Sequence, residues 1–551
     1  MKGQPEVIVL GMGARLERYL PTSSGGLEML LGDLFSSAAD LGVPMRGIIL
    51  ASNKGYSRQR IDSRGYQQDE PVLWVPERVL PRSPVQATIF HEGRPLRIAC
   101  EDYTVRGQKG EVPVMLLDTN VDGNDPRQRE ITSVLYADDD QREIRAAQCN
   151  VLGRGALAML RVRNIEPIVV HLNEGHGSFF PLAEYMEGAS LDWIKGNTVF
   201  STHTPVPAGH DIFSLDLMRR IFGALPQGIE DIGGKTSFST TRAAIFFSRY
   251  VNAVSSTHAE ACKKMEVFKD TEVHNIPNGI YPPTWVVQPL AQLYDAYLQG
   301  WRLDPRIFEH ADRIPDEALL QARDKANRLL IGYINYTTNA QFYPDVATFA
   351  WGRRFATYKR PLLIFHDPDR LERIAETYGG MQFVLSGKSH PRDQDGKGLV
   401  REAWLKQKTS NNRRVVYLTG YDEEIARMMV SGSDFWLNTP IKPQEASGTS
   451  GMKVAANGGL NISIADGWWA EALQRFPGEP FGYTIGDLVQ RSDAEEANSL
   501  YEQMEQALEL RRHPHDLAAM QKRSLKLIAF YNTNRQIRQL AEEVYHFPLL
   551  S

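Results

Sequence analysis

The sequence contains few cysteines and no long apolar run. Its three cysteines, Cys100, Cys149 and Cys262, lie far apart in a chain of 551 residues. This spacing argues against a disulfide framework or a CxxC metal site and suits a reducing compartment. No apolar stretch approaches the ~20 residues that a membrane span needs, and no secretory signal is visible at the N-terminus. We therefore expect a cytoplasmic protein without a membrane partner.

The sequence also lacks a large excess of positive or negative charge. The formal net charge is -5, which argues against a nucleic-acid partner. The hydrophobic content of 42% and the charged content of 23% are ordinary for a globular protein. Because 551 residues exceed what one hydrophobic core usually serves, we expect at least two domains. The sequence leaves a homo-oligomer open.

Common nucleotide and metal motifs are incomplete. Leu16 replaces the last glycine that a GxGxxG dinucleotide fingerprint needs after Gly11 and Gly13. Gln382 stands where a P-loop ending in Ser386–Ser389 needs a glycine. Four histidines of the first half lack the HExxH spacing of a zinc helix: His171, His176, His203 and His210. We expect neither NAD nor a metal.

Apolar runs of strand length alternate with helical runs in both halves of the chain. The first half has runs at 6–10, 48–51, 168–172, 198–202 and 251–254, and helical stretches at 27–41, 141–162 and 259–265. The second half has runs at 346–350, 362–365, 383–385, 415–418 and 434–437, and helical stretches at 316–330, 499–510 and 516–545. This alternation predicts an α/β fold of two Rossmann-like, doubly wound domains facing a cleft.

A proline cluster at 281–283 interrupts the pattern and predicts the domain boundary. We expect an N-terminal domain at 1–280 and a C-terminal domain at 281–551, which the final helices 516–545 close. Strand-like pieces at 72–75 and 114–117, without helices between them, predict a β-rich, antiparallel insertion around residues 70–130.

Polar residues follow two of the predicted strands directly. Asn173-Glu174-Gly175-His176 ends one strand, and His203-Thr204-Pro205 ends the next. Side chains at the carboxyl ends of parallel strands are site candidates, because ligands bind in the crevice there. A glycine loop at 23–26 opens the helix predicted at 27–41. It is either a phosphate cradle or a plain N-cap turn.

Two further segments carry cations in a pattern suited to phosphate chemistry. Arg353, Arg354, Lys359 and Arg360 follow the strand at 346–350 and form either a solvated turn or a phosphate clamp. The segment EASGTSGMK at 445–453 offers a carboxylate, hydroxyls, glycines and one lysine before a helical run at 452–457. Lys453, in semi-apolar surroundings, is suited to a lowered pKa and to an imine with an aldehyde. The alternative is a Gly/Ser turn with a solvated lysine.

The order of these segments resembles the α-glucan (glycogen/maltodextrin) phosphorylase family. The resemblance rests on SSGGL, HLNEGH, STHTPVPAGHD, PNGI, RRFATYKR, SGKSHP, WLNTP and EASGTSGMK. It implies the two-domain GT-B architecture and retaining glycosyl transfer by phosphorolysis. The expected reaction converts α-1,4-glucan or maltodextrin and inorganic phosphate to glucose 1-phosphate. Pyridoxal 5'-phosphate would serve as the acid/base phosphate relay.

The resemblance also implies a role for individual residues. Lys453 would hold pyridoxal 5'-phosphate as an imine, with Thr449 at its phosphate and Tyr421 near its ring. Arg354 and Lys359 would bind the substrate phosphate, with Arg353 beside them and the amides of Gly25 and Gly26 opposite. The glucosyl hydroxyls would be held by His203, Asn278, Glu445, Ser447 and Gly448. Glu174 and His176 would lie on the cleft wall.

Two features depart from the family pattern. Glu28 replaces a glycine in the N-terminal loop, where a carboxylate repels phosphate unless it points away or is paired. The chain is also compact for this family, so we expect no allosteric control of the kind that N-terminal extensions carry. Glu28 favours an alternative function, a retaining glycosyltransferase that uses a sugar nucleotide or sugar phosphate and a small acceptor. Lys453 favours phosphorolysis, and a silent carbohydrate-binding relative is the third alternative.

Overall fold

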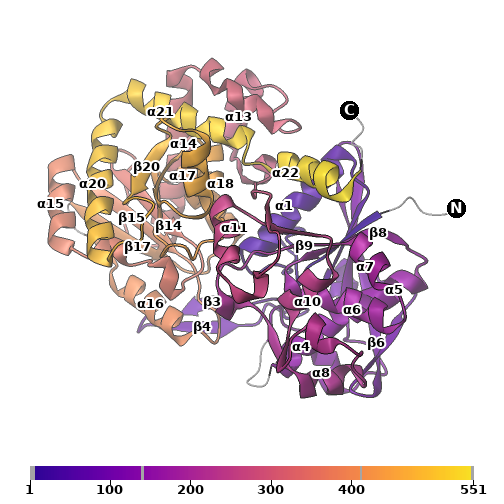
Figure 1. The fold of residues 1–551 in the computed structure, drawn as a ribbon. Helices are drawn as coiled ribbons and strands as arrows, with labels where there is room; N and C mark the ends of the chain where they lie inside the picture. The colour runs from indigo at the N-terminus through magenta and orange to yellow at the C-terminus, as the bar shows by residue number, and fades with distance from the viewer. Residues whose placement is uncertain (1–5, 138–141, 410–411, 548–551) are drawn as a thin grey trace. The chain divides into compact units, whose positions relative to one another are not determined.

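The chain folds into two compact units, drawn in Figure 1. The computed structural model describes residues 6–137, 142–409 and 412–547. Unit 1 comprises residues 1–57, 71–277 and 536–551, and unit 2 comprises 58–70 and 278–535. The domains predicted at 1–280 and 281–551 therefore differ from these units in two segments, and by residues 278–280 at the boundary, which belong to unit 2. Residues 58–70 belong to unit 2, and residues 536–551 belong to unit 1.

Unit 1 contains a nine-stranded sheet in the order β13-β12-β9-β8-β1-β2-β7-β6-β5. The strands are β1 Glu6–Leu10, β2 Met45–Leu50, β5 Ala87–His91, β6 Arg94–Arg106, β7 Glu111–Asp118, β8 Pro167–Asn173, β9 Thr198–Ser201, β12 Tyr250–Ala253 and β13 His274–Asn275. Neighbours from β13 to β7 pair in parallel, whereas β6 is antiparallel to β7 and to β5. The β-rich segment around 70–130 thus forms an antiparallel edge of the main sheet. The strand predicted at 72–75 is wrong, because those residues form no strand.

Helices cover both faces of this sheet. They include α1 Gly26–Leu41, α4 Glu143–Asn150, α5 Ala156–Val162, α6 Phe179–Met186, α7 Leu191–Asn197, α8 Leu215–Phe222, α10 Thr240–Phe247 and α11 Ser256–Lys263. In β1, Ile8 packs in one hydrophobic cluster and Val9 in the other, so both sheet faces are buried. The helix predicted at 141–162 is confirmed as α4 and α5, joined by a π-helical turn at Val151–Gly155. Its first residue, Gln141, lies outside the described residues.

Unit 2 contains a seven-stranded sheet in the order β16-β17-β15-β14-β18-β19-β20, parallel except for β16. Its strands are β14 Ala347–Gly352, β15 Met381–Ser386, β16 Lys408–Thr409, β17 Arg413–Leu418, β18 Phe435–Asn438, β19 Leu460–Ile464 and β20 Gly482–Ile485. Its helices include α12 Pro282–Trp285, α13 Gln288–Tyr297, α14 Asp316–Thr337, α15 Pro368–Tyr378, α16 Gln394–Leu405, α17 Glu423–Gly432, α18 Ser450–Ala456, α19 Gly467–Arg475, α20 Asp493–Arg511 and α21 Pro514–Lys526. The strand predicted at 362–365 is wrong, because Leu363–Phe365 is a 3-10 turn.

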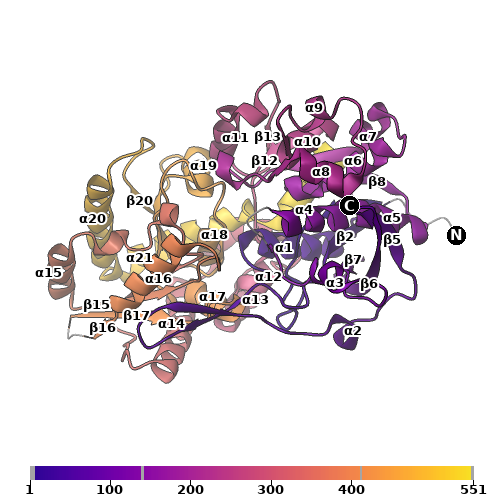
Figure 2. The same cartoon turned by 90° about the horizontal axis from the view of Figure 1, so that it is seen from below.

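A hairpin from the first part of the chain belongs to unit 2. Its strands are β3 Arg58–Ile61 and β4 Gln67–Glu70; β4 contacts α16, and Figure 1 labels both strands beside that helix, which Figure 2 shows from below. The Gln59 amide donates to the carbonyl of Gly387 at 2.9 Å and contacts the Tyr417 hydroxyl at 2.9 Å. An ion pair joins Lys397 to Asp69 at 2.7 Å. Because polar contacts hold the hairpin, its strands lack the apolar pattern by which strands were predicted from the sequence.

The structure confirms a mixed α/β fold with two mostly parallel sheets. The last helices are α21, α22 Thr533–Gln539 and a π-helical turn at Leu540–Tyr545, which packs in unit 1. There the Tyr545 hydroxyl lies 2.6 Å from Nδ1 of His171. Within the residues that the structure describes, no helix is both long and apolar enough to cross a membrane.

Candidate active site

The four cations of the turn after β14 lie in three different environments. Arg353 and Lys359 are buried, and both contact the Glu445 carboxylate, with Nη1 of Arg353 at 3.0 Å. Arg360 is also buried, but it bonds Glu496 and the carbonyls of the 439–440 segment, so its role is structural. Arg354 is exposed. Only part of this cationic turn is thus available for a ligand.

Close backbone packing fixes the cationic turn. The Arg353 amide donates to the carbonyl of Ser386 at 3.2 Å, and the Phe355 amide donates to that of Lys388 at 3.0 Å. Gly387 lies between them with φ +153°, and a Cβ there would sit 1.9 Å from the Arg353 carbonyl oxygen. Only glycine fits this approach. The glycine of SGKS therefore serves loop packing after two adjacent parallel strands.

Two buried carboxyl groups in this cluster titrate differently. Burial alone would raise the pKa of Glu445, but Lys359 and Arg353 hold that pKa below its usual value. Burial raises the pKa of Asp466 to about 7, although its oxygens accept the amides of Glu445 and Gly467 at 2.9 Å. At neutral pH, Glu445 is therefore a fixed anion, whereas Asp466 is partly protonated.

Lys453 lies in α18 with its ammonium against an aromatic face. The side chain is buried, and Nζ lies 3.5 Å from the centroid of a Trp285 ring, a cation–π contact. The Asn457 amide donates to the Trp285 carbonyl at 3.0 Å and to that of Lys453 at 2.8 Å, which ties the two segments together. Sequence reasoning missed Trp285, because its proline-rich neighbourhood indicated only a domain boundary.

The remaining predicted residues of unit 2 lie in the same loops or close to the domain boundary. The Tyr421 hydroxyl donates to the Gly352 carbonyl at 3.0 Å, and burial raises its pKa. Gly448 has φ +78°, and Thr449 precedes α18 directly. The buried Oγ of Ser447 has no hydrogen-bond partner among the residues that the structure describes. Asn278 is buried at the start of unit 2.

In unit 1, the polar residues after β8 and β9 meet at the carboxyl edge of the sheet. Nε2 of His203 lies 2.9 Å from Oδ1 of Asn173, and Glu174 accepts the His203 amide at 2.8 Å. Glu174 has φ +80° and ψ 164°, a strained conformation for a residue other than glycine. Burial lowers the pKa of His203 to about 4, so this ring is neutral at physiological pH.

The other three histidines named in the sequence analysis have distinct protein partners. Burial lowers the pKa of His171 to about 3, and its ring lies inside the sheet rather than at the strand end. Nδ1 of His176 lies 3.3 Å from the Arg145 guanidinium, which forms an ion pair with Asp211 at 2.8 Å. Nδ1 of His210 lies 2.8 Å from the Thr241 hydroxyl. Sequence reasoning missed Arg145, because a single charge in a long segment gives no motif, and it gave no role to Asp211, the last residue of STHTPVPAGHD.

Three carboxylates are close enough for a metal ion: Glu77, Glu101 and Asp118. Arg82 forms ion pairs with all three, so a cation of the chain already compensates their charge. Asp118 ends β7, three strands from β8 in the sheet, and nothing in the cluster indicates a catalytic role.

The glycine loop is bonded to its own helix. Gly25 precedes α1, and its amide donates to Oε2 of Glu28 at 2.8 Å. The Ser24 amide and hydroxyl donate to the same oxygen at 3.2 and 2.8 Å, and the Tyr136 hydroxyl donates to Oε1. Of the two orientations considered for Glu28, the structure has the paired one. Sequence reasoning missed Tyr136, which lies 108 residues away.

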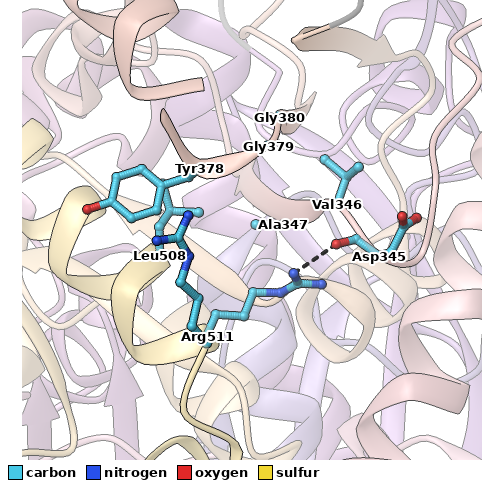
Figure 3. A pocket seen from close by; sticks show the side chains of 9 residues that line it. Asp345, Val346, Ala347, Tyr378, Gly379, Gly380, Leu508 and Arg511 are labelled. Atoms are coloured by element: carbon cyan, nitrogen blue, oxygen red, sulfur yellow. Dashed lines mark hydrogen bonds between the residues drawn. The ribbon is translucent and has the colours of Figure 1, made fainter. Parts of the chain in front are cut away.

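A pocket in unit 2 lies at the opposite strand ends from the cationic turn. It is lined by Asp345, Val346, Ala347, Tyr378, Gly379, Gly380, Leu508, Arg511 and Arg512. Figure 3 shows Arg511 reaching across it to the Asp345 carbonyl, at 2.8 Å. The pocket is separate from the candidate site, because Val346 precedes β14 and Gly380 precedes β15, whereas Arg353 and Gly387 follow those strands.

Comparison with known proteins places these features in one family. Residues 229–545 match the model of the carbohydrate phosphorylase family. The chain is 33% identical to the maltodextrin phosphorylase of Thermococcus litoralis, over 99% of this chain and 71% of that protein. It is 31% identical to the glycogen phosphorylase of Aquifex aeolicus, over 90% and 79% respectively. An uncharacterized protein of Methanocaldococcus jannaschii is 29% identical over 96% of this chain and 98% of its own length.

The family match includes the cationic turn and the segment around Lys453. It covers more than half of the chain, and the similarity to the maltodextrin phosphorylase, which spans 99% of this chain, extends to the glycine loop and to the residues after β8 and β9. The resemblance on which the sequence analysis relied is confirmed. The chain belongs to the carbohydrate phosphorylase family.

Proposed function

We propose that this chain catalyses the phosphorolysis of α-1,4-glucan or maltodextrin by inorganic phosphate, releasing glucose 1-phosphate with retention of configuration. The relatives named maltodextrin and glycogen phosphorylase support this function. The observation that carries it is a buried ion-pair cluster. Arg353 and Lys359 of the cationic turn contact Glu445, which lies in the loop that leads to Lys453. We propose further that units 1 and 2 are the two Rossmann-like halves of a GT-B glycosyltransferase.

The residues around Lys453 fit pyridoxal 5'-phosphate. Lys453 offers a buried amine on an aromatic face, and Thr449 directly precedes the helix that carries it. Thr449 would contact the cofactor phosphate, and Tyr421 would pack near the ring. When bound, the cofactor supplies a phosphate group that exchanges a proton with inorganic phosphate.

The chain's own residues would position the substrates. Lys359 and the exposed Arg354 would bind inorganic phosphate, while Arg353 stays anchored to Ser450 Oγ at 3.1 Å. Phosphate would compete with Glu445 for the ammonium group of Lys359, since that group already contacts a carboxylate. A bound phosphate anion then stabilises the positive charge that develops on the glucosyl ring as the glycosidic bond breaks.

A second set would hold the glucosyl hydroxyls: His203, Asn278, Glu445, Ser447 and Gly448. His203 is suited to this task, because its lowered pKa keeps the ring neutral. A neutral imidazole both donates and accepts a hydrogen bond, as a sugar hydroxyl does. Glu174 would fix His203 through its main-chain amide, and His176 would lie on the wall of the site.

One observation favours a second candidate, a retaining glycosyltransferase that uses a sugar nucleotide or sugar phosphate and a small acceptor. Glu28 accepts the amides of the glycine loop, which a phosphate acceptor would otherwise use. The donor of such a transferase would still need the cations of unit 2. The two candidates differ in the acceptor, so product analysis separates them.

The test combines spectroscopy with product analysis. The near-ultraviolet spectrum of the full chain, with and without borohydride, reports a reducible cofactor, and glucose 1-phosphate release from maltodextrin plus phosphate reports the reaction. Lys453→Ala should abolish cofactor retention, whereas Lys325→Ala, an exposed lysine of α14, should retain it. A full cofactor signal in Lys453→Ala would contradict the assignment of Lys453. Cofactor without glucose 1-phosphate would favour the transferase.

A further inference from the structure

The carboxylate of Glu28 is enclosed at the start of α1. The residue is 2% exposed, and both of its oxygens accept hydrogen bonds. Three donors from Ser24 and Gly25 point at Oε2, and the Tyr136 hydroxyl points at Oε1. The donors of the glycine loop therefore already face an anion, which belongs to the chain itself.

Tyr136 is held in place from a second side. Burial, and then the charge of Glu28, raises the pKa of Tyr136 well above its usual value, so its hydroxyl stays protonated and donates. The Arg145 guanidinium lies over the tyrosine ring, 4.8 Å from its centroid. Arg145 is itself fixed by Asp211, with contacts at 2.8 and 3.0 Å. This buried network keeps Glu28 directed at the loop.

The arrangement changes what the loop can bind. A glycine loop at the start of a helix offers its amides and the positive end of the helix dipole to an anion. In this chain both act on Glu28. A phosphate at the loop would have to displace the carboxylate, and it would face a like charge at short range in a buried environment.

We propose that Glu28 is a specificity-determining residue that keeps phosphate off the glycine loop. Phosphate is then bound by the cations of unit 2, Arg354 and Lys359, without the amides of Ser24 and Gly25, which Glu28 occupies. The inference rests on the proposed phosphorolysis, in which inorganic phosphate is the acceptor. The inference predicts that the wild type binds phosphate more weakly than a variant in which no carboxylate occupies the glycine loop.

Equilibrium titration of the full chain with inorganic phosphate tests this inference. Glu28→Gly should lower the phosphate dissociation constant about tenfold, the equivalent of one charge-assisted hydrogen bond. Glu28→Gln keeps an acceptor oxygen but removes the charge, so its gain should be smaller. Glutamine is accepted at this helix position, which makes this variant informative even if the glycine variant does not fold.

Glu17→Gln is the matched control. Glu17 also accepts a tyrosine hydroxyl, that of Tyr103 at 2.7 Å, but it is exposed and contacts no loop amide in the described structure. The phosphate affinity of the Glu17→Gln variant should equal that of the wild type. Equal affinities of the wild type and both Glu28 variants would overturn the inference.

Glucose 1-phosphate release by the wild type is measured in parallel. Release without any gain in phosphate affinity at Glu28 leaves the proposed function intact and contradicts the role of Glu28. A gain in affinity without release supports the role of Glu28 and contradicts phosphorolysis. The two failures are thus distinguishable, because the titration does not depend on turnover.

Discussion

The glycine loop of unit 1 and the cationic turn of unit 2 each hold a buried carboxylate, but with donors of different charge. Among the described residues, the donors to Glu28 are all neutral, namely two main-chain amides and two hydroxyls. Glu445 accepts from two buried cations, Arg353 and Lys359. Removing Glu28 therefore frees neutral groups, whereas removing Glu445 leaves buried positive charge. Glu28 therefore sets which ligands the glycine loop binds, whereas Glu445 is needed for the fold of the cationic turn.

Replacement of Glu445 should give the largest effect. Glu445→Gln removes the negative charge between Arg353 and Lys359, and breaking a buried ion pair from one side costs about 3–5 kcal/mol in the free energy of unfolding. Denaturant unfolding measures this loss. Glu479→Gln, at an exposed position of the same unit, is the control and should leave stability unchanged. A similar stability of both variants would show that solvent reaches the two cations.

Two glycines sharpen the comparison: Gly26 in the glycine loop, and Gly387, which packs against the cationic turn. A Cβ on Gly387 would sit 1.9 Å from a backbone oxygen, so Gly387→Ala must shift the turn and should cost about 1–3 kcal/mol. A Cβ on Gly26 meets no atom within 4 Å among the described residues, so Gly26→Ala should be neutral or slightly stabilising. Thermal unfolding of both variants tests the pair. A loss at Gly26 as large as that at Gly387 would contradict the packing argument.

The sequence predicted the interior of the sheets well, because buried strands are short apolar runs. Strands at 6–10, 168–172 and 415–418 were found within two residues of their predicted bounds. The run at 362–365 was misassigned because burial alone does not separate a strand from a packed turn. There the Tyr501 hydroxyl bonds the Ile364 carbonyl at 3.0 Å, a contact that no local pattern encodes.

The site was predictable where chemistry follows a motif and not where it depends on distant partners. The motifs predicted the cationic turn, but not that Arg360 serves the fold through Glu496. Glu28 was recognised as a departure, but its orientation depends on Tyr136. The roles of the individual site residues remain predictions.

The pH dependence of stability distinguishes the two carboxyl groups beside the cationic turn. Burial raises the pKa of Asp466 to about 7, above the value of roughly 4 expected in the unfolded chain. Between these values the folded state holds a proton that the unfolded state has lost, so stability decreases as the pH rises from about 4 to about 7. The slope is at most about 1.4 kcal/mol per pH unit. Asp466→Asn should lack this component.

Denaturant unfolding from pH 4 to 8 measures the difference between the wild type and Asp466→Asn. Other carboxyl groups with a raised pKa, such as Glu101 and Glu184, contribute equally to both proteins and cancel in the difference. Asparagine keeps one acceptor oxygen, so one of the amides of Glu445 and Gly467 loses its acceptor, at a cost that does not vary with pH. Only the pH-dependent part therefore reports the ionisation of Asp466. Parallel curves for the two proteins would mean that Asp466 stays ionised beside Glu445, and that Lys359 and Arg353 compensate both charges.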